Sequence, residues 1–208
     1  MNYLDPSEYE AYGLETTTPL AWVTCASAMI DAHCRRTSLA IAQYQERLRL
    51  AEDRNTVRLT YLPLAAAGPA TTPIVSAQGR YATPRRGDWA MEDIRSQAAL
   101  VFGLPNTWTA IDPAAIDVYP ETGELRLPVN VLGLAFSEID VVYTAGLSTI
   151  PGAVKTACAQ IVRNAQATPA LNVRTSQMDR LHMQYFADTL VDQMVRNLLA
   201  PYVAQKVG

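Results

Sequence analysis

Histidine, lysine and cysteine are scarce in this chain of 208 residues, and their scarcity excludes several kinds of chemistry. The histidines are His33 and His182, and the cysteines are Cys25, Cys34 and Cys158, with no CxxC pair among them. Closed zinc sites need clustered Cys and His ligands, and nucleophilic catalysis needs a nucleophile beside a base. We therefore expect that the chain is not an enzyme and that it binds no metal or other cofactor. We interpret the cysteines as small buried residues.

A basic excess and long apolar runs are also missing. The net charge is −3, with 17 basic and 20 acidic residues, which does not indicate a nucleic-acid groove. No stretch approaches the roughly 20 apolar residues of a membrane span, and the N-terminus lacks the basic start of a signal peptide. Neither a Walker loop nor a GxGxxG motif occurs. We expect a soluble protein that is synthesised inside the cell and has no membrane partner.

Two long helices are predicted in the first 170 residues, after a short one that starts at Asp5-Pro6. The first long helix follows Thr18-Pro19 and runs to about Arg35. We expect Trp22, Ala26, Met29, Ile30 and His33 to form its apolar face. The second starts at Pro151 and ends before Thr168-Pro169. Its core stripe comprises Val154, Ala157, Cys158, Ile161, Val162 and Ala165.

Alternating apolar residues predict strands between the helices. Residues 38–50 and 57–62 are expected to pair as a hairpin around a polar AEDRN turn, and residues 74–81 to form a further strand. Ile116–Tyr119 and Glu124–Leu127 should pair across a tight turn that contains Gly123. A strand over 139–144 ends at Gly146, where we expect a backbone conformation that disfavours larger residues. Segments 63–73 and 83–109 are expected to be loops, the latter with a short helix from Asp88 to Phe102.

The apolar pattern of the last segment predicts a long helix over 175–207. Ser176 would cap it, and Pro201 would break it near Asn197. Such a helix is apolar on two sides, and one small body can cover only one of them. Either side could be the internal one. The first side comprises Leu181, Tyr185, Val191, Val195, Leu199 and Tyr202, and the other comprises Met183, Phe186, Leu190 and Met194.

These expectations give an α+β fold: a small helical body with an antiparallel β-meander or hairpin, and a long C-terminal helix. We place the body in residues 1–170. Residues 171–208 are expected to form a helical arm that makes contacts between chains.

Four short motifs follow one another in a characteristic order. They are PETGELR at 120–126, VYTAG at 142–146, Ile150-Pro151 at a helix start, and LLAPY at 198–202. In order and spacing the chain resembles the head–tail connector, or adaptor, proteins of long-tailed bacteriophages over most of residues 16–203. Segments 63–73 and 83–109 are longer than is typical of that family.

The resemblance implies a structural virion protein that forms a ring, of twelve copies in that family, between the portal and the tail. The ring would extend the DNA channel, through which DNA passes without sequence-specific binding, and would offer a docking surface to the tail. Its partners would be the portal protein, a tail-side stopper or tail terminator protein, and other copies of itself. The protein would be located in the virion neck after synthesis in the host bacterial cytoplasm.

The candidate contact residues lie in two places. Those for the portal or a neighbouring copy are Phe186, Leu190, Met194, Leu198 and Tyr202, and those in the loops are Arg80, Arg85, Arg86 and Trp89. Two alternatives stay open: another neck protein, such as a tail-completion or stopper protein, and an enzyme of unrecognised class.

Overall fold

The computed structural model describes residues 1–50, 55–66, 72–81, 101–104, 106–129, 135–167, 175–178, 181–184 and 190–205. The chain divides into two compact units. Unit 1 combines Met1–Leu39 with Thr149–Ala204, and unit 2 comprises Ala40–Ser148 with the last four residues. This division differs from the predicted boundary at 170/171, because the residues after 189 pack into the same core as the N-terminal helix.

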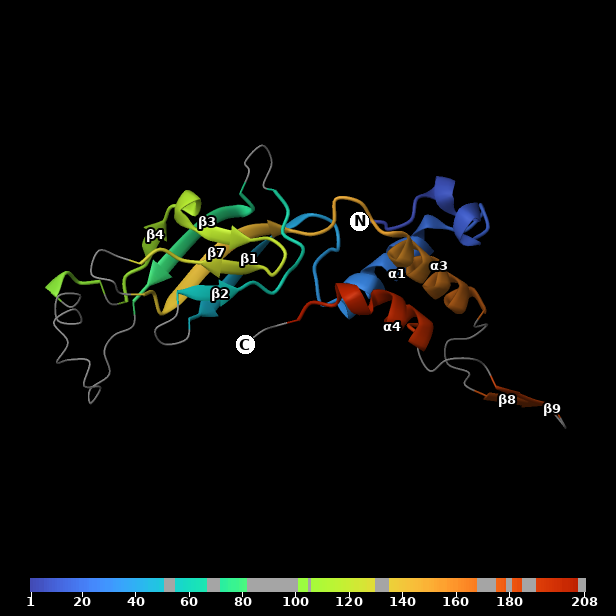
Figure 1. Cartoon of the computed structure of the whole chain (residues 1–208). Coiled ribbons are helices and arrows are strands. Elements are labelled where there is room, and N and C mark those ends of the chain that lie inside the picture. The colour runs from blue at the N-terminus through green and yellow to red at the C-terminus, as the bar shows by residue number, and fades with distance from the viewer. Residues whose placement is uncertain are drawn as a thin grey trace. The chain divides into compact units, whose positions relative to one another are not determined.

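Unit 1 is helical, and its helices lie side by side in Figure 1. Short 3-10 turns at Pro6–Glu8 (η1) and Glu10–Tyr12 (η2) precede α1, which spans Leu20–His33. Helix α3 spans Gly152–Ala167, and α4 with η5 covers Gln193–Tyr202. Both predicted long helices are confirmed, and each begins directly after a proline, which suits a helix start.

The buried face of α1 differs from the predicted one. Val23, Ala26, Ile30 and Cys34 are at most 1% exposed and, with Ser27, form a stripe at the helical spacing of i, i+3, i+4, i+7, i+11. Trp22 is 40% exposed. Cys25 is exposed too, so its interpretation as a buried residue was wrong, whereas Cys34 and Cys158 are buried as expected. The stripe on α3 is confirmed from Val154 to Val162.

The long C-terminal helix is not present as predicted. Residues Thr175–Met178 form strand β8 and Leu181–Gln184 form strand β9, and the two strands pair with each other. Ser176 therefore lies in a strand and caps no helix. Helix α4, Gln193–Leu199, begins at Asp192, whose carboxylate accepts the Val195 N–H at 2.8 Å. As a cap, Asp192 satisfies a free N–H of the first turn.

Unit 2 is built on antiparallel strands. One sheet has the order β1-β7-β3-β4 (Figure 1). Its strands are β1 (Ala42–Arg49), β7 (Glu138–Ala145), β3 (Ile74–Arg80) and β4 (Thr109–Ile111). Strand β7 lies between two neighbours and alternates fully buried Ile139, Val141 and Tyr143 with partly buried residues. The predicted strands at 74–81 and 139–144 are thereby confirmed.

A second sheet in unit 2 has the order β2-β6-β5. Its strands are β2 (Thr56–Arg58), β6 (Glu124–Arg126) and β5 (Asp117–Tyr119), which follows a 3-10 turn, η4, at Pro113–Ala115. The predicted pairing of 116–119 with 124–127 is confirmed. Gly123 between them has φ of 68°, a left-handed conformation that glycine adopts without a steric cost.

The predicted hairpin between residues 38–50 and 57–62 is wrong in its pairing. Strand β1 pairs over all eight residues with β7, whereas β2 pairs with β6. The two segments still share a core. The Tyr44 and Tyr61 rings stack at 4.1 Å, and Glu46 accepts the Thr60 N–H at 3.2 Å. A long apolar partner such as β7 offers β1 more cross-strand contacts than a three-residue strand can.

Together the two units confirm the α+β fold class, with two antiparallel sheets in unit 2, and with helices and the two-stranded β8–β9 sheet in unit 1.

Candidate protein interface

The C-terminal contact residues divide between the core and the surface of unit 1. Leu190, Leu198 and Tyr202 are partly buried and pack against the core cluster. Val195 and Leu199 are completely buried, whereas Met194 is 54% exposed. The internal side of this segment is therefore the one that contains Val195. Phe186 lies outside the described residues.

An apolar groove of about 260 Å³ lies between α1 and α3 in unit 1. Among the described residues, Leu190 is the one member of the predicted contact set that lines it, and the Cys25 thiol is the one ionisable group in the lining. The residues that line the groove are Ala21, Trp22, Cys25, Ala26, Met29, Ile161, Val162, Ala165 and Leu190. An open apolar groove of this kind is a surface to which another apolar group can bind.

Hydrogen bonds from one α3 side chain fix the rim of the groove. The Asn164 amide nitrogen donates to the Leu190 carbonyl at 3.1 Å and to the Asp192 carboxylate at 3.2 Å. The Asn164 amide oxygen accepts from Gln160 one turn earlier at 2.9 Å. Because Asp192 also caps α4, the same contacts place Leu190 and the helix that follows it against α3.

The sequence prediction placed Trp22 and Met29 on the buried face of α1, and so did not identify the groove. The small residues Ala26 and Ser27 contribute to the buried stripe, while the larger Trp22 remains 40% exposed. Helical spacing alone does not separate the two faces. Val23, Ala26, Ser27 and Ile30 form a complete i, i+3, i+4, i+7 set, and so do Trp22, Cys25, Ala26 and Met29.

In unit 2 the predicted contact residue Arg80 belongs to a cluster around Glu138. Arg80 and Arg47 each place a guanidinium nitrogen 2.8 Å from the same Glu138 oxygen, and Arg49 contacts the other oxygen at 3.3 Å. Both Arg47 and Arg80 also lie over the Trp108 ring, about 5 Å from its centre, as cation–π pairs do. Arg85, Arg86 and Trp89 lie outside the described residues.

This cluster holds Glu138 in its charged form. Hydrogen bonds from Arg47 and Arg80 lower the pKa of the Glu138 carboxyl below its ordinary value. The Glu138 side chain is 11% exposed, whereas that of Arg49 is 88% exposed. Three guanidinium groups around one carboxylate leave a net positive surface that extends outward at Arg49.

The buried ionisable groups of unit 1 are held in their neutral form. Burial raises the pKa of the Cys34 thiol to about 11 and also raises that of Cys158. Burial and a hydrogen bond to Asp31 raise the pKa of Tyr3 to about 12. The Tyr3 oxygen accepts the Leu39 N–H at 2.8 Å, which ties the N-terminus to the end of the first helical segment. These groups contribute packing and hydrogen bonds, since a protonated thiol is a poor nucleophile.

Within the described ranges, no group of three His, Cys, Asp or Glu side chains is placed to hold a metal ion. No helix in this part of the chain is long and apolar enough to cross a membrane. No protein-family model matches the chain, and a search of curated proteins finds no match either. The candidate surfaces are therefore the groove of unit 1 and the arginine cluster of unit 2.

Proposed function

We propose that this chain is a structural protein of a bacteriophage particle, a head–tail adaptor that forms a ring between the portal and the tail. In this role its copies surround the DNA channel and offer the next tail-side protein a docking surface. The role is structural: each copy binds its neighbours in the ring, the portal on one side and the tail-side protein on the other.

The observation that carries the proposal is the ordered set of motifs, together with their places in the fold. PETGELR forms the turn from β5 to β6, with Gly123 in the left-handed conformation. VYTAG ends β7, and Gly146 has φ of 132°. Pro151 directly precedes α3, and LLAPY closes the C-terminal helical turns over residues 198–202. Each motif therefore lies at a junction between elements, where a shared fold constrains the residue type.

The backbone at Gly146 leaves no space for a side chain. A Cβ atom at this position would lie 2.4 Å from the Ala40 carbonyl oxygen, so only glycine fits there. Ala40 and Leu147 form a bridge at the same place, where the chain enters and leaves unit 2. The motif thus closes unit 2 at the point where the chain continues toward the second long helix.

A ring of identical copies needs two different patches that match each other on neighbouring copies. The chain offers distinct surfaces on its two units: an apolar groove on the helical unit and an arginine cluster on the sheet unit. The helical unit, with α1 of 14 residues and α3 of 16, also favours an adaptor over a stopper, since stoppers are smaller β-barrels. The acidic balance of the chain, −3 overall, suits a channel through which DNA slides without adhering.

Removal of the chain from the phage that encodes it tests the proposal. Cells that carry a nonsense codon in the gene should accumulate DNA-filled heads without tails, and free tails where tails assemble independently. Supplying the intact chain from a plasmid should restore tailed particles, and supplying a Gly146→Val chain serves as the misfolded control. Normal tailed particles in the absence of the chain would contradict the proposal.

A further inference from the structure

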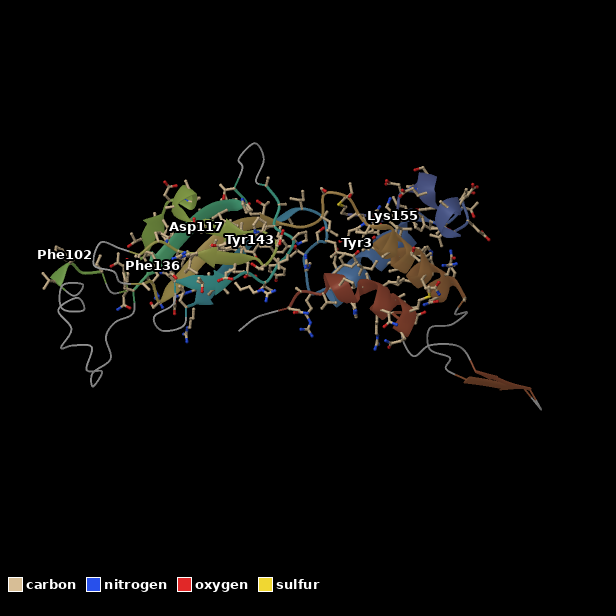
Figure 2. All side chains as sticks on the ribbon, viewed as in Figure 1. Tyr3, Phe102, Asp117, Phe136, Tyr143 and Lys155 are labelled. Carbon is tan, nitrogen blue, oxygen red and sulfur yellow. The ribbon has the colours of Figure 1, made fainter. Side chains whose placement is uncertain are left out.

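An exposed apolar pair lies on unit 2, at the end of the short helix that the sequence predicts within the loop over 83–109. Phe102 is 71% exposed and its neighbour Val101 is 83% exposed. In Figure 2 the labelled Phe102 side chain extends away from the sheets of unit 2. Exposure of large apolar side chains to water is unfavourable, and groups of such side chains often mark a contact with another molecule.

The turn that carries Phe102 is anchored to unit 2. Leu104, two residues later, packs against the core of that unit, and the Asn106 N–H donates to the Tyr81 carbonyl at 3.1 Å. The Thr107 hydroxyl donates to the Gly103 carbonyl at 3.1 Å. Because Leu104 takes the inward position of this turn, Phe102 is left on its outer side.

The groove of unit 1 has the size and chemistry that such a side chain requires. Its volume is about 260 Å³. A cavity of about 150 Å³ lined by aliphatic and aromatic side chains can bind benzene, so a phenyl ring fits with room to spare. Trp22 and Met29 lie in the lining, and they offer an aromatic face and a sulfur atom, both of which contact aromatic rings favourably.

We propose that Phe102 of one copy inserts into the α1–α3 groove of a neighbouring copy in the assembled ring. This inference rests on the proposed function, because the ring is what brings the two surfaces together. The contact joins two different patches, so it is heterologous, and a heterologous contact closes into a ring where the rotation between neighbouring copies divides a full turn. It also unites two sequence predictions, since Leu190 was a candidate interface residue and 83–109 was a candidate contact loop.

The area of the contact indicates that it acts as one anchor among several. Burying a phenylalanine removes about 150–250 Å² from water, whereas a stable interface buries about 800 Å² on each partner. Two copies held by this contact alone would therefore dissociate. In a ring each copy is kept near its neighbours, and the high effective concentration makes the same contact strong.

Cys25 provides a natural reporter for this contact. It lines the groove and is exposed, whereas Cys34 and Cys158 are buried. Two single-reporter chains distinguish a contact between copies from one within a copy. The donor chain has Phe102→Cys together with Cys25→Ala, and the acceptor chain is unaltered and carries a different affinity tag. The matched control donor has Val129→Cys with Cys25→Ala, at a position of unit 2 that is 52% exposed.

Donor and acceptor are co-assembled in phage-producing cells, and the particles are treated with a mild thiol oxidant and separated without reduction. The expected result is a disulfide-linked species that contains both tags, at least tenfold more abundant with the Phe102→Cys donor than with the Val129→Cys donor. Mass spectrometry should locate the bond at position 102 of one chain and Cys25 of the other. Equal linking by both donors would overturn the inference, as would particles that contain both chains without linking them. A further chain carries Phe102→Cys and keeps Cys25. If this chain forms a disulfide within one copy, while donor and acceptor chains form none with each other, the inference is overturned.

The failure of this contact and the failure of the proposed function give different results. If the chain is present in the neck but positions 102 and 25 do not link, the contact alone is wrong. If the chain is absent from particles, the proposed function is wrong, whatever linking the purified chains show. A milder variant, Phe102→Ala, should lower the yield of tailed particles at least fivefold at equal amounts of folded chain. An unchanged yield would count against the contact.

Discussion

The amide of Asn164 on α3 donates to the carboxylate of Asp192, which itself caps helix α4. The same amide nitrogen holds the Leu190 carbonyl, so a single side chain fixes both the rim of the groove and the start of the last helix. The C-terminal segment from 190 onward is thus a part of the helical unit, with Val195 and Leu199 completely buried in its core. Removing it would expose that core.

Asn164→Ala and Asp192→Ala should both loosen α4. Loss of the cap costs about 0.5–2 kcal/mol, and leaving the Leu190 carbonyl without its donor costs about 1–3 kcal/mol. Because the two side chains share a hydrogen bond, the double variant should lose less than the two single losses added together. Chemical denaturation measures the totals, and hydrogen exchange over residues 193–199 reports the local effect. Gln193→Ala, which alters an exposed hydrogen bond on the same helix, is the control. Strict additivity would argue against the coupling.

Ile161→Ala should destabilise unit 1 by about 2–5 kcal/mol, the usual range for emptying a buried aliphatic site. Ile161 is 2% exposed on the core stripe of α3 and also lines the groove. The midpoint of urea unfolding should fall without a change in slope. Gln166→Ala, on the exposed side of the same helix, should leave the midpoint almost unchanged. Equal midpoints for the two variants would show that α3 is not a core helix.

Gly146→Ala should destabilise unit 2 by several kcal/mol or prevent it from folding. The backbone at Gly146 has φ of 132°, where side chains are disfavoured, and the added carbon would lie 2.4 Å from the Ala40 oxygen. Gly152→Ala is a fair comparison, because the nearest atom to a Cβ there is 3.7 Å away. Its thermal midpoint should be equal to or above that of the unaltered chain. A Gly146→Ala chain with a normal midpoint would contradict the described closure of unit 2.

Glu138 should make the stability of unit 2 depend on pH in the acidic range. Its pKa in the folded state lies below the ordinary value of 4.5 because Arg47 and Arg80 donate hydrogen bonds to the carboxylate. A carboxyl with a lowered folded pKa stabilises the fold fully above the unfolded value, and that contribution is lost as the pH falls through the folded value. The Glu138→Gln chain should thus be less stable than the unaltered chain at pH 7, and the difference should shrink below about pH 4.5. A difference that stayed constant down to pH 2.5 would show that the ionisation of Glu138 does not contribute.

The elements that local chemistry determines could be predicted from the sequence. Pro19 and Pro151 mark the starts of the two long helices, and the apolar spacing from Val154 to Val162 gives the buried side of α3. The turn at Gly123 and the constraint at Gly146 also follow from the residues themselves, since both have positive φ. In each case the signal lies within a few residues of the feature.

Features that depend on distant partners could not be predicted in this way. Strand β1 pairs with β7, about a hundred residues further along the chain, and nothing near β1 indicates that choice. The apolar pattern after residue 175 fits a helix and a pair of strands about equally well over such short runs, and the strands are what form. The role of Asp192 as a cap depends on where the last helix begins. The groove residue Trp22 was placed on the buried face because it falls at helical spacing with Ala26 and Met29, a spacing that does not show which side of the helix a partner covers.

The central claim, that this chain is a ring-forming adaptor between the portal and the tail, is tested most directly by a single-particle reconstruction of the neck of the phage that encodes it. The account predicts a ring of repeated density on the tail side of the portal, into which both units fit: the helices of unit 1, with α1 and α3 in contact, and the sheets of unit 2. A chain-specific antibody fragment should add density to the same ring. A neck whose density is fully explained by other proteins, with no site for the antibody fragment, would contradict the account.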